Sequence, residues 1–302
     1  MEEIKLKLVT FIKNSKKTLG IKNEEGIIDI KSALAIYPNP NVPTEIMDVI
    51  EGGEETLSIL ENYIETIEIN PNSSYVLNEK ELDWGPCVTN PEKIICVGLN
   101  YKKHADETNS PYPQTPILFN KFNNTLTGNL CDISIPKVTE KLDYEVELGI
   151  VIGRTAKYIS KEEALDYVFG YCAVNDLSAR DLQLRTPQWL LGKSCDGFSP
   201  IGPYLVTAEE VGNPNNLNLT TTVNGEVRQS SNTSDMIFHC DEIVSYISQH
   251  MTLSPGDVIL TGTPEGVVLG LPEDKQVYLQ PGDQVTIEIE KLGALTNNFI
   301  AE

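Results

Sequence analysis

The segment that decides the fold reads Leu142-Asp143-Tyr144-Glu145-Val146-Glu147-Leu148-Gly149-Ile150. Apolar side chains occupy alternate positions, which is the period of a β-strand, so Glu145 and Glu147 project side by side from the opposite face. Such a pair is most often the charged, solvent-facing side of a strand. The alternative is a pair of oxygen ligands for a hard metal ion.

Asp176 favours the metal-ligand interpretation, because it is a third carboxylate and follows directly after an apolar run. That run is Tyr171-Cys172-Ala173-Val174; Asn175-Asp176 follow it directly, and Arg180 and Gln183 come shortly after. Three carboxylates would supply ligands suited to Mg²⁺ or Mn²⁺ and leave coordination positions open for water and substrate. Convergence of Glu145, Glu147 and Asp176 is the resulting hypothesis.

From Lys93 onward the chain alternates short β-branched runs with turn sequences, which predicts strands. The predicted strands are residues 94–97, 146–152, 171–174, 258–260 and 285–289. Pro255-Gly256-Asp257 and Pro281-Gly282-Asp283 precede the last two strands, and Pro followed by Gly suits a type II turn. Helices are predicted only at 161–168, with Ser160 as N-cap, and at 240–250. Since helices do not follow every strand, a β-rich α+β fold is expected, not a doubly wound sheet.

The first part of the chain has a different pattern. It predicts strands at residues 6–12 and 26–30 and an acidic helical stretch over 43–63 that is interrupted at Gly52-Gly53. Residues 70–74 have turn and linker composition. We therefore expect a small N-terminal α/β domain, residues 1–85, and a larger domain, residues 86–302.

Composition excludes some classes of function. The 302 residues carry 23 Lys and Arg against 44 Asp and Glu, a net charge of −21, which repels nucleic acid and anionic membranes. No apolar run approaches the ~18–20 residues of a membrane span, and the first eight residues show no secretory signal. The six cysteines form no Cys-x-x-Cys pair. Reduced thiols and a cytoplasmic location are expected.

Outside the carboxylates, His104 and Glu107 are the pair best suited to acid–base chemistry. If their segment is helical, residues three apart share a face, and a carboxylate touching the imidazole fixes its tautomer and raises its basicity. A surface pair is the alternative interpretation. His239 and His250 flank the predicted helix at 240–250, where capping or core roles are expected.

Lys193 and Thr263 lie in turn-rich stretches that resemble nucleotide-binding motifs only in part. Gly192-Lys193-Ser194 lacks the phosphate-loop glycine, because Pro187 stands in its place, and Gly262-Thr263-Pro264 breaks the dinucleotide fingerprint. An exposed loop lysine is the ordinary interpretation of Lys193. The Thr263 hydroxyl could hold a carboxylate, although a plain turn is the default.

Five stretches together resemble the fumarylacetoacetate hydrolase family, and the resemblance spans residues 93–302. In order, the stretches are Cys96 to Glu107, Asp143 to Leu148, Asn175 to Gln183, Gly192 to Pro203 and Leu260 to Gly266. The resemblance implies a β-rich core with mixed sheets that form a partly open barrel, a homodimer, and one divalent ion per subunit. The first ~90 residues are similar to the variable N-terminal domain of bacterial members.

The resemblance also implies roles for particular residues. Glu145, Glu147 and Asp176 match the metal ligands. His104 and Glu107 match a catalytic pair on a segment that closes over substrate, and Lys193 matches a lysine near metal and substrate. Arg180, Gln183 and Thr263 match positions that orient ligands. Gly197 departs from the threonine found in many relatives.

The implied substrates are small anionic 2-oxo acids, and the implied reaction is hydrolysis of a C–C bond in an acylpyruvate. Decarboxylation of oxaloacetate, or a decarboxylase or isomerase step on a related 2-oxo diacid, is the alternative because it passes through the same enolate. A dehydratase of sugar-derived 2-oxo acids and a non-catalytic scaffold are weaker alternatives. Because such substrates are anions, we expect Arg180 and Lys193 to form a local cationic pocket within the acidic molecule.

Overall fold

The computed structural model describes residues 6–302, so the first five residues of the N-terminal segment considered above lie outside it. Strands are the commonest regular structure in the described chain, and they form mixed β-sheets. The strands are β1 (Lys7–Lys13), β2 (Lys16–Asn23), β3 (Gly26–Asp29), β4 (Val76–Leu77), β5 (Ile94–Gly98), β6 (Ile117–Lys121), β7 (Leu126–Thr127), β8 (Asp132–Ile135), β9 (Leu142–Asp143), β10 (Val146–Ile152), β11 (Val168–Asn175), β12 (Ser178–Ala179), β13 (Ser199–Thr207), β14 (Asn218–Val223), β15 (Glu226–Asn232), β16 (Val258–Leu260), β17 (Gln284–Ile289) and β18 (Gly293–Ala301).

Helices are fewer, and most are short. They are α1 (Ile30–Leu34), α2 (Ile46–Thr66), α3 (Lys102–Glu107), α4 (Arg180–Gln183), α5 (Leu190–Lys193), α6 (Ala208–Val211) and α7 (Cys240–His250). No helix of the described residues is long and apolar enough to cross a membrane.

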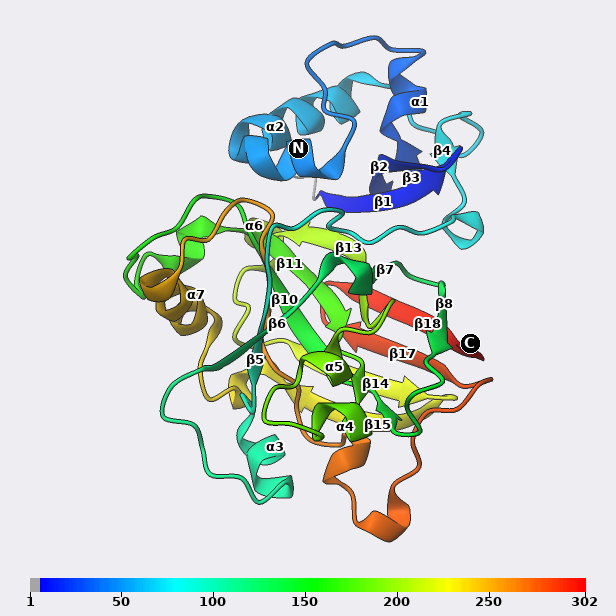
Figure 1. The fold of residues 1–302 in the computed structure, drawn as a ribbon. Helices are drawn as coiled ribbons and strands as arrows, with labels where there is room; N and C mark the ends of the chain where they lie inside the picture. Colours follow the sequence, from blue (N-terminus) through cyan, green and yellow to red (C-terminus); the bar gives the residue numbers. More distant parts are fainter. Residues whose placement is uncertain (1–5) are drawn as a thin grey trace.

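The large sheet runs β4-β3-β2-β1-β13-β11-β10-β16-β5-β6, with β7 beside β13. A second sheet of five strands, β15-β14-β17-β18-β8, packs against it, and β12 and β9 form a small ribbon. Within the large sheet β16 and β5 are parallel, whereas β10 and β11 are antiparallel. Mixed open sheets in a β-rich α+β fold are therefore confirmed (Figure 1).

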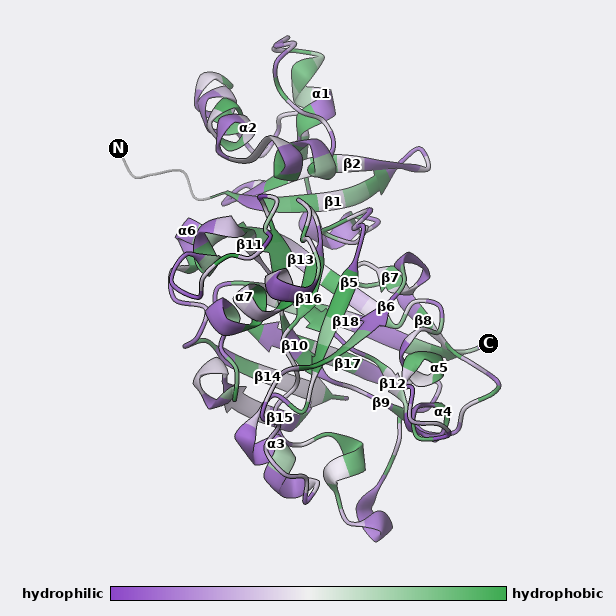
Figure 2. Ribbon diagram, turned by 60° about the vertical axis from the view of Figure 1, so that its left-hand side comes forward, coloured by the Kyte–Doolittle hydropathy of each residue, from purple (hydrophilic) through white to green (hydrophobic). Residues whose placement is uncertain are grey.

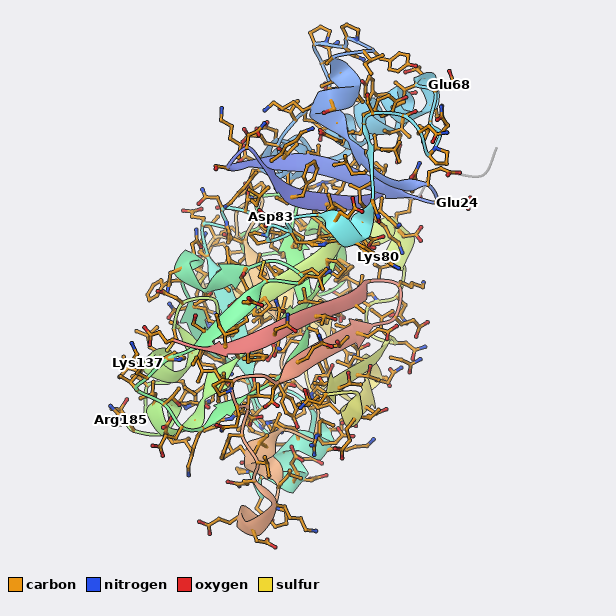
Figure 3. All side chains as sticks on the ribbon, turned by 90° about the vertical axis from the view of Figure 1, so that its right-hand side faces the viewer. Glu24, Glu68, Lys80, Asp83, Lys137 and Arg185 are labelled. Carbon is orange, nitrogen blue, oxygen red and sulfur yellow. The ribbon has the colours of Figure 1, made fainter. Side chains whose placement is uncertain are left out.

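Both faces of the large sheet are covered, and this explains the near-continuous apolar runs of its central strands. Along β10 and β11, Ile150 and Tyr171 point into one apolar cluster together with Ile287 of the second sheet. Their neighbours Val151 and Cys172 point into another cluster on the opposite face. Figure 2 shows apolar residues concentrated in these central strands. Many charged side chains lie on the surface, among them the six exposed ones labelled in Figure 3.

The strands predicted after Lys93 are confirmed, and so is the helix at 240–250, which is α7. Gly256 and Gly282 have φ of 87° and 99°, as the predicted Pro-Gly turns require. The helix predicted at 161–168 is wrong. Residues 161–163 form a turn, a 3₁₀ helix spans Ala164–Tyr167, and β11 begins at Val168.

The N-terminal residues form a layer of their own above the rest of the molecule in Figure 1. Helix α2 covers 46–66 with its break at Gly53, whose φ is 58°, close to the predicted acidic helix. The sheet is nevertheless continuous, because β1 pairs with β13 at Lys7↔Val206 and Leu8↔Leu205. The division at residue 85 stays a proposal.

Candidate active site

The carboxylates of Glu145, Glu147 and Asp176 converge. Each offers an oxygen, and these oxygens lie within 4.8 Å of one another. The pairing of β10 with β11 brings them together, because Val146 at the start of one strand is opposite Asn175 at the end of the other. The backbone N–H of Asp176 donates to the carbonyl oxygen of Glu145 at 2.9 Å and fixes this corner.

All three side chains are buried, with residue exposures of 5%, 2% and 0%. A solvent-facing pair at 145 and 147 is therefore the wrong interpretation, since a second layer of structure covers that face of β10. Burial of three carboxylates at one point costs several kcal/mol per ion unless cations compensate.

Two lysines supply part of that compensation. Lys193 Nζ lies 2.7 Å from Glu145 Oε2 and 2.7 Å from Asp176 Oδ2, and its side chain is only 3% exposed. Lys121 Nζ pairs with the other oxygen of Asp176 and donates to the carbonyl oxygen of Phe198 at 2.6 Å. An exposed loop position for Lys193 is thus excluded.

Arg180 is held by three partners. Its Nε donates to Asp143 Oδ2 at 2.8 Å, one terminal nitrogen donates to Gln183 Oε1 at 2.9 Å, and the other lies 2.7 Å from Glu145 Oε1. The guanidinium therefore supports Glu145 directly, and Gln183 lies beside it on the first turn after Asp176. Asp143, which precedes β10, is fully buried.

The pKa values of the cluster follow from these contacts. Burial raises the pKa of Glu145, but Lys193 and Arg180 outweigh it and hold the value at about 2. Burial first, and then Asp176 and Glu145, raise the pKa of Glu147 well above its usual range. Burial lowers the pKa of Lys193, but Asp176 and Glu145 outweigh it and raise that pKa above its usual range.

Glu147 shows why the cluster fits a divalent cation. Its Oε2 accepts a hydrogen bond from the Gly262 backbone N–H at 2.7 Å. Within residues 6–302, no basic side chain forms an ion pair with it. Three oxygen donors at one corner, one of them without a cation, form a site whose charge and ligand chemistry suit Mg²⁺ or Mn²⁺.

His104 and Glu107 lie on α3, as the helical interpretation requires. His104 Nδ1 lies 2.7 Å from Glu107 Oε1, and the two side chains are 10% and 19% exposed. The other carboxylate oxygen of Glu107 accepts a hydrogen bond from the Gly266 backbone N–H at 3.0 Å. Because Nδ1 is engaged by the carboxylate, the second ring nitrogen is the one left for proton transfer.

A cavity of about 170 Å³ connects the His104–Glu107 pair, here called the dyad, with the acidic cluster of Glu145, Glu147 and Asp176. Its lining includes seven of the nine predicted residues, namely His104, Glu145, Glu147, Arg180, Gln183, Lys193 and Thr263. Glu107 and Asp176 are absent from the lining; each contacts a residue that lines it. Phe119 and Trp189 form an apolar wall with ring centroids 5.2 Å apart. The cavity thus has a charged side and an apolar side.

Thr263 is placed by a residue that the sequence analysis missed. Gln229, on β15, is 1% exposed. Its Nε2 donates to Thr263 Oγ1 and to the Pro264 carbonyl, each at 2.9 Å. Lys121 was missed as well. The only signal for Lys121 is its two-residue spacing from Phe119, which places both on one face of β6.

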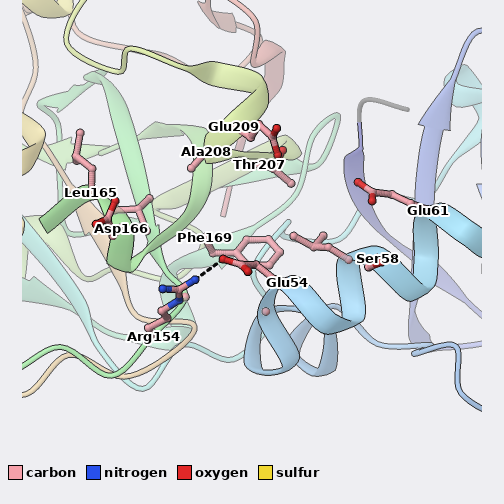
Figure 4. A pocket seen from close by; sticks show the side chains of 14 residues that line it. Glu54, Ser58, Glu61, Arg154, Leu165, Asp166, Phe169, Thr207, Ala208 and Glu209 are labelled. Atoms are coloured by element: carbon pink, nitrogen blue, oxygen red, sulfur yellow. Dashed lines mark hydrogen bonds and ion pairs between the residues drawn. The ribbon is translucent and has the colours of Figure 1, made fainter. Parts of the chain in front are cut away.

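A larger cleft of about 640 Å³ lies elsewhere, between α2 and the large sheet (Figure 4). It contains none of the nine predicted residues, and its lining includes four acidic side chains, Glu54, Glu61, Asp166 and Glu209. An exposed ion pair between Arg154 and Glu54 crosses it. Size alone therefore does not mark the functional site of this molecule.

Comparison with known proteins identifies the family of this chain. The family model "Fumarylacetoacetate (FAA) hydrolase C-terminal" matches residues 93–300. The mitochondrial oxaloacetate tautomerase FAHD2A of Bos taurus is 41% identical over 286 residues, which cover 93% of this chain and 87% of that protein.

Two solved structures extend the comparison. A fumarylacetoacetate hydrolase from Exiguobacterium antarcticum is 33% identical, with a TM-score of 0.82, and covers 98% of this chain and all of its own. The fumarylpyruvate hydrolase of Pseudomonas aeruginosa, described in complex with Mn²⁺ and pyruvate, is 33% identical with a TM-score of 0.65. The match covers 71% of this chain and 91% of that one.

Proposed function

The chain belongs to the fumarylacetoacetate hydrolase family, and we propose that it is a divalent-metal-dependent enzyme acting on a small 2-oxo acid. We propose keto–enol tautomerisation of oxaloacetate as the first candidate reaction, because the similar Bos taurus protein is named an oxaloacetate tautomerase. The observation that carries the proposal is the buried Glu145–Glu147–Asp176 cluster, which shares one cavity with the His104–Glu107 pair.

Glu145, Glu147 and Asp176 would hold the ion. Bound there, it would act as a Lewis acid toward the 2-oxo and carboxylate oxygens of the substrate. Lys193, which pairs with Glu145 and Asp176 and lines the cavity, would supply positive charge beside the developing oxyanion.

Tautomerisation moves a proton between carbon 3 and the oxygen on carbon 2. His104 is the group suited to this transfer, since Glu107 holds one ring nitrogen and the ring lines the cavity. Arg180 and Gln183 orient the charged end of the substrate, and Thr263 borders the same space. A homodimer and a cytoplasmic location stay predictions.

Hydrolysis of acylpyruvates is the second candidate, and the resemblance to a fumarylpyruvate hydrolase favours it. The same His104 would then activate a water molecule for attack on the distal carbonyl. Oxaloacetate decarboxylation needs no activated water, so it depends less on the dyad.

A substrate panel tests the proposal. Tautomerisation and decarboxylation of oxaloacetate and hydrolysis of acetylpyruvate and fumarylpyruvate are compared by kcat/KM with Mg²⁺, with Mn²⁺ and after chelation. We expect activity to require the ion and Glu147→Gln to abolish it, whereas Glu288→Gln, at an exposed strand position, is without effect. Full activity after complete metal removal would contradict the proposal. His104→Ala should suppress hydrolysis and tautomerisation more than decarboxylation, and equal losses would contradict that division of roles.

A further inference from the structure

The carboxylate of Glu107 is held by a loop far away in the sequence. Besides its contact with His104, Glu107 accepts a hydrogen bond at Oε2 from the backbone N–H of Gly266. Gly266 begins a loop, residues 266–271, that includes a 3₁₀ helix at Val268–Gly270. In Figures 1 and 2, α3 lies beside this segment, which is orange in Figure 1.

Gly270 makes the close approach of Glu107 to this loop sterically possible. A Cβ atom at position 270 would lie 2.4 Å from the carboxyl carbon of Glu107 and 2.7 Å from each of its oxygens. The φ of Gly270 is outside the left-handed region, so its backbone alone does not demand glycine. The space taken by Glu107 is therefore the reason for glycine at this position.

The loop itself is fixed to Asp143 and Tyr144, the two residues that directly precede Glu145 of the acidic cluster. The Asp143 carboxylate accepts hydrogen bonds from the backbone N–H groups of Val268 at 2.9 Å and Leu269 at 3.1 Å. Tyr144 O–H donates to the Gly266 carbonyl at 3.0 Å. Because the loop is anchored at three points, a side chain added at 270 would displace Glu107 and leave the loop in place.

We propose that Gly270 is a positioning residue, whose missing side chain lets the Glu107 carboxylate lie against the 266–271 loop and orient His104. The consequence for catalysis rests on the function proposed above; the contact itself does not. Because Glu107 accepts from Nδ1–H, the contact selects the Nδ1-protonated form of the His104 ring. Without it, the ring loses its fixed tautomer and proton transfer slows.

The test compares Gly270→Ala, Glu107→Ala and the double variant with the unmodified protein. The first measurement is the tautomer ratio of His104 by ¹⁵N NMR, which needs no substrate and is simplified because the chain has three histidines. We expect Gly270→Ala to shift the ratio as Glu107→Ala does, and the double variant to equal Glu107→Ala. Leu271→Ala, which adds no atom toward Glu107, should leave the ratio unchanged.

The second measurement is turnover with the best substrate of the panel. Gly270→Ala should lower kcat about tenfold or more, with KM within about threefold, and should have no further effect in the Glu107→Ala background. An unchanged His104 tautomer, or an equal loss of kcat in both backgrounds, would overturn the proposal. If Gly270→Ala does not fold, a folded double variant supports the steric argument, and a double variant that also fails overturns it. Absence of turnover in the unmodified protein would count against the proposed function and leave the NMR result decisive for Gly270.

Discussion

At the scale of single residues, Lys121 is a position where charge and burial conflict. Its ammonium is completely enclosed and pairs with Asp176, which is also enclosed. Breaking a buried pair by removing one partner typically costs about 3–5 kcal/mol when the other charge is left unpaired. Because Lys193 would still pair with Asp176, we expect removal of the Lys121 charge to cost about 3 kcal/mol or less.

Lys121→Met should therefore destabilise the protein, and a bound divalent ion should reduce the loss, because the ion would replace one of the two positive charges that face Asp176. The measurement is denaturant unfolding with chelator and with saturating Mn²⁺. Lys137→Met, at an exposed position, is the matched control and should change stability by less than about 0.5 kcal/mol. The same loss for Lys121→Met in both conditions would contradict this account.

Residues of the site differ in how far the sequence predicts them. Glu145, Glu147 and Asp176 could be found because they interrupt or end apolar runs that predict strands. A charged side chain at such a position is unusual and indicates a specific role. Lys121 could not, since its burial depends on a partner 55 residues away. Arg180 was predicted as a source of charge for the substrate; the structure shows that its guanidinium also contacts Asp143, Glu145 and Gln183, three contacts that the sequence does not predict.

At the scale of elements, Asn100 fixes the point where the chain leaves β5 and enters α3. Its Nδ2 donates to the carbonyls of Phe238 at 3.0 Å and Thr261 at 2.7 Å, and its Oδ1 accepts from Phe238 N–H at 2.8 Å. Asn100 is completely buried. These bonds tie the helix that carries His104 to two distant segments.

Asn100→Ala should lower the free energy of unfolding by roughly 2–4 kcal/mol, because it removes three buried hydrogen bonds and leaves backbone groups unpaired. It should also raise KM, since α3 loses its fixed starting point. Thermal unfolding and steady-state kinetics measure the two effects. Asn62→Ala, at an exposed position of α2, serves as control, and a similar result for both variants would contradict the role of Asn100.

The elements that sequence patterns missed have identifiable causes. Strand β2 contains Gly20, and a glycine inside a segment weakens a strand prediction. In the structure, a Cβ atom at position 20 would lie 2.6 Å from the Ile27 side chain of the neighbouring strand, so close packing between strands accounts for the glycine. The helix predicted at 161–168 fails because Val168 is the first residue of β11, which pairs with the end of β10. In both places strand pairing decides the local structure, and the sequence of the segment alone does not contain it.

At the scale of the whole molecule, the N-terminal elements share an apolar cluster with the large sheet. Leu8, Ile28 and Leu60 of the N-terminal part pack in one cluster with Cys172 and Leu205 of β11 and β13. The division at residue 85 therefore describes chain order better than independent stability.

A protein shortened to residues 86–302 should aggregate or unfold at lower temperature, because one face of the sheet would be exposed. Size-exclusion chromatography and thermal unfolding test this. Glu54→Ala removes only the exposed ion pair with Arg154, so it should cost less than about 1 kcal/mol and serves as the mild counterpart. A monodisperse shortened protein with unchanged thermal stability would show that the cluster is dispensable.

The charge of the whole molecule and the charge of its site have opposite consequences for an anionic substrate. The net charge is −21, whereas the buried site sets four carboxylates, Asp143, Glu145, Glu147 and Asp176, against Lys121, Lys193 and Arg180. A divalent ion would make that set positive by one charge. Attraction therefore acts only inside the cavity, and the surface repels the substrate over distances that salt screens within about 10 Å at 0.1 M. Raising salt from about 20 to 200 mM should thus leave kcat/KM unchanged or increase it, with kcat constant because the bound substrate is shielded. A steep fall of kcat/KM would mean that attraction reaches beyond the cavity, which the acidic surface does not allow.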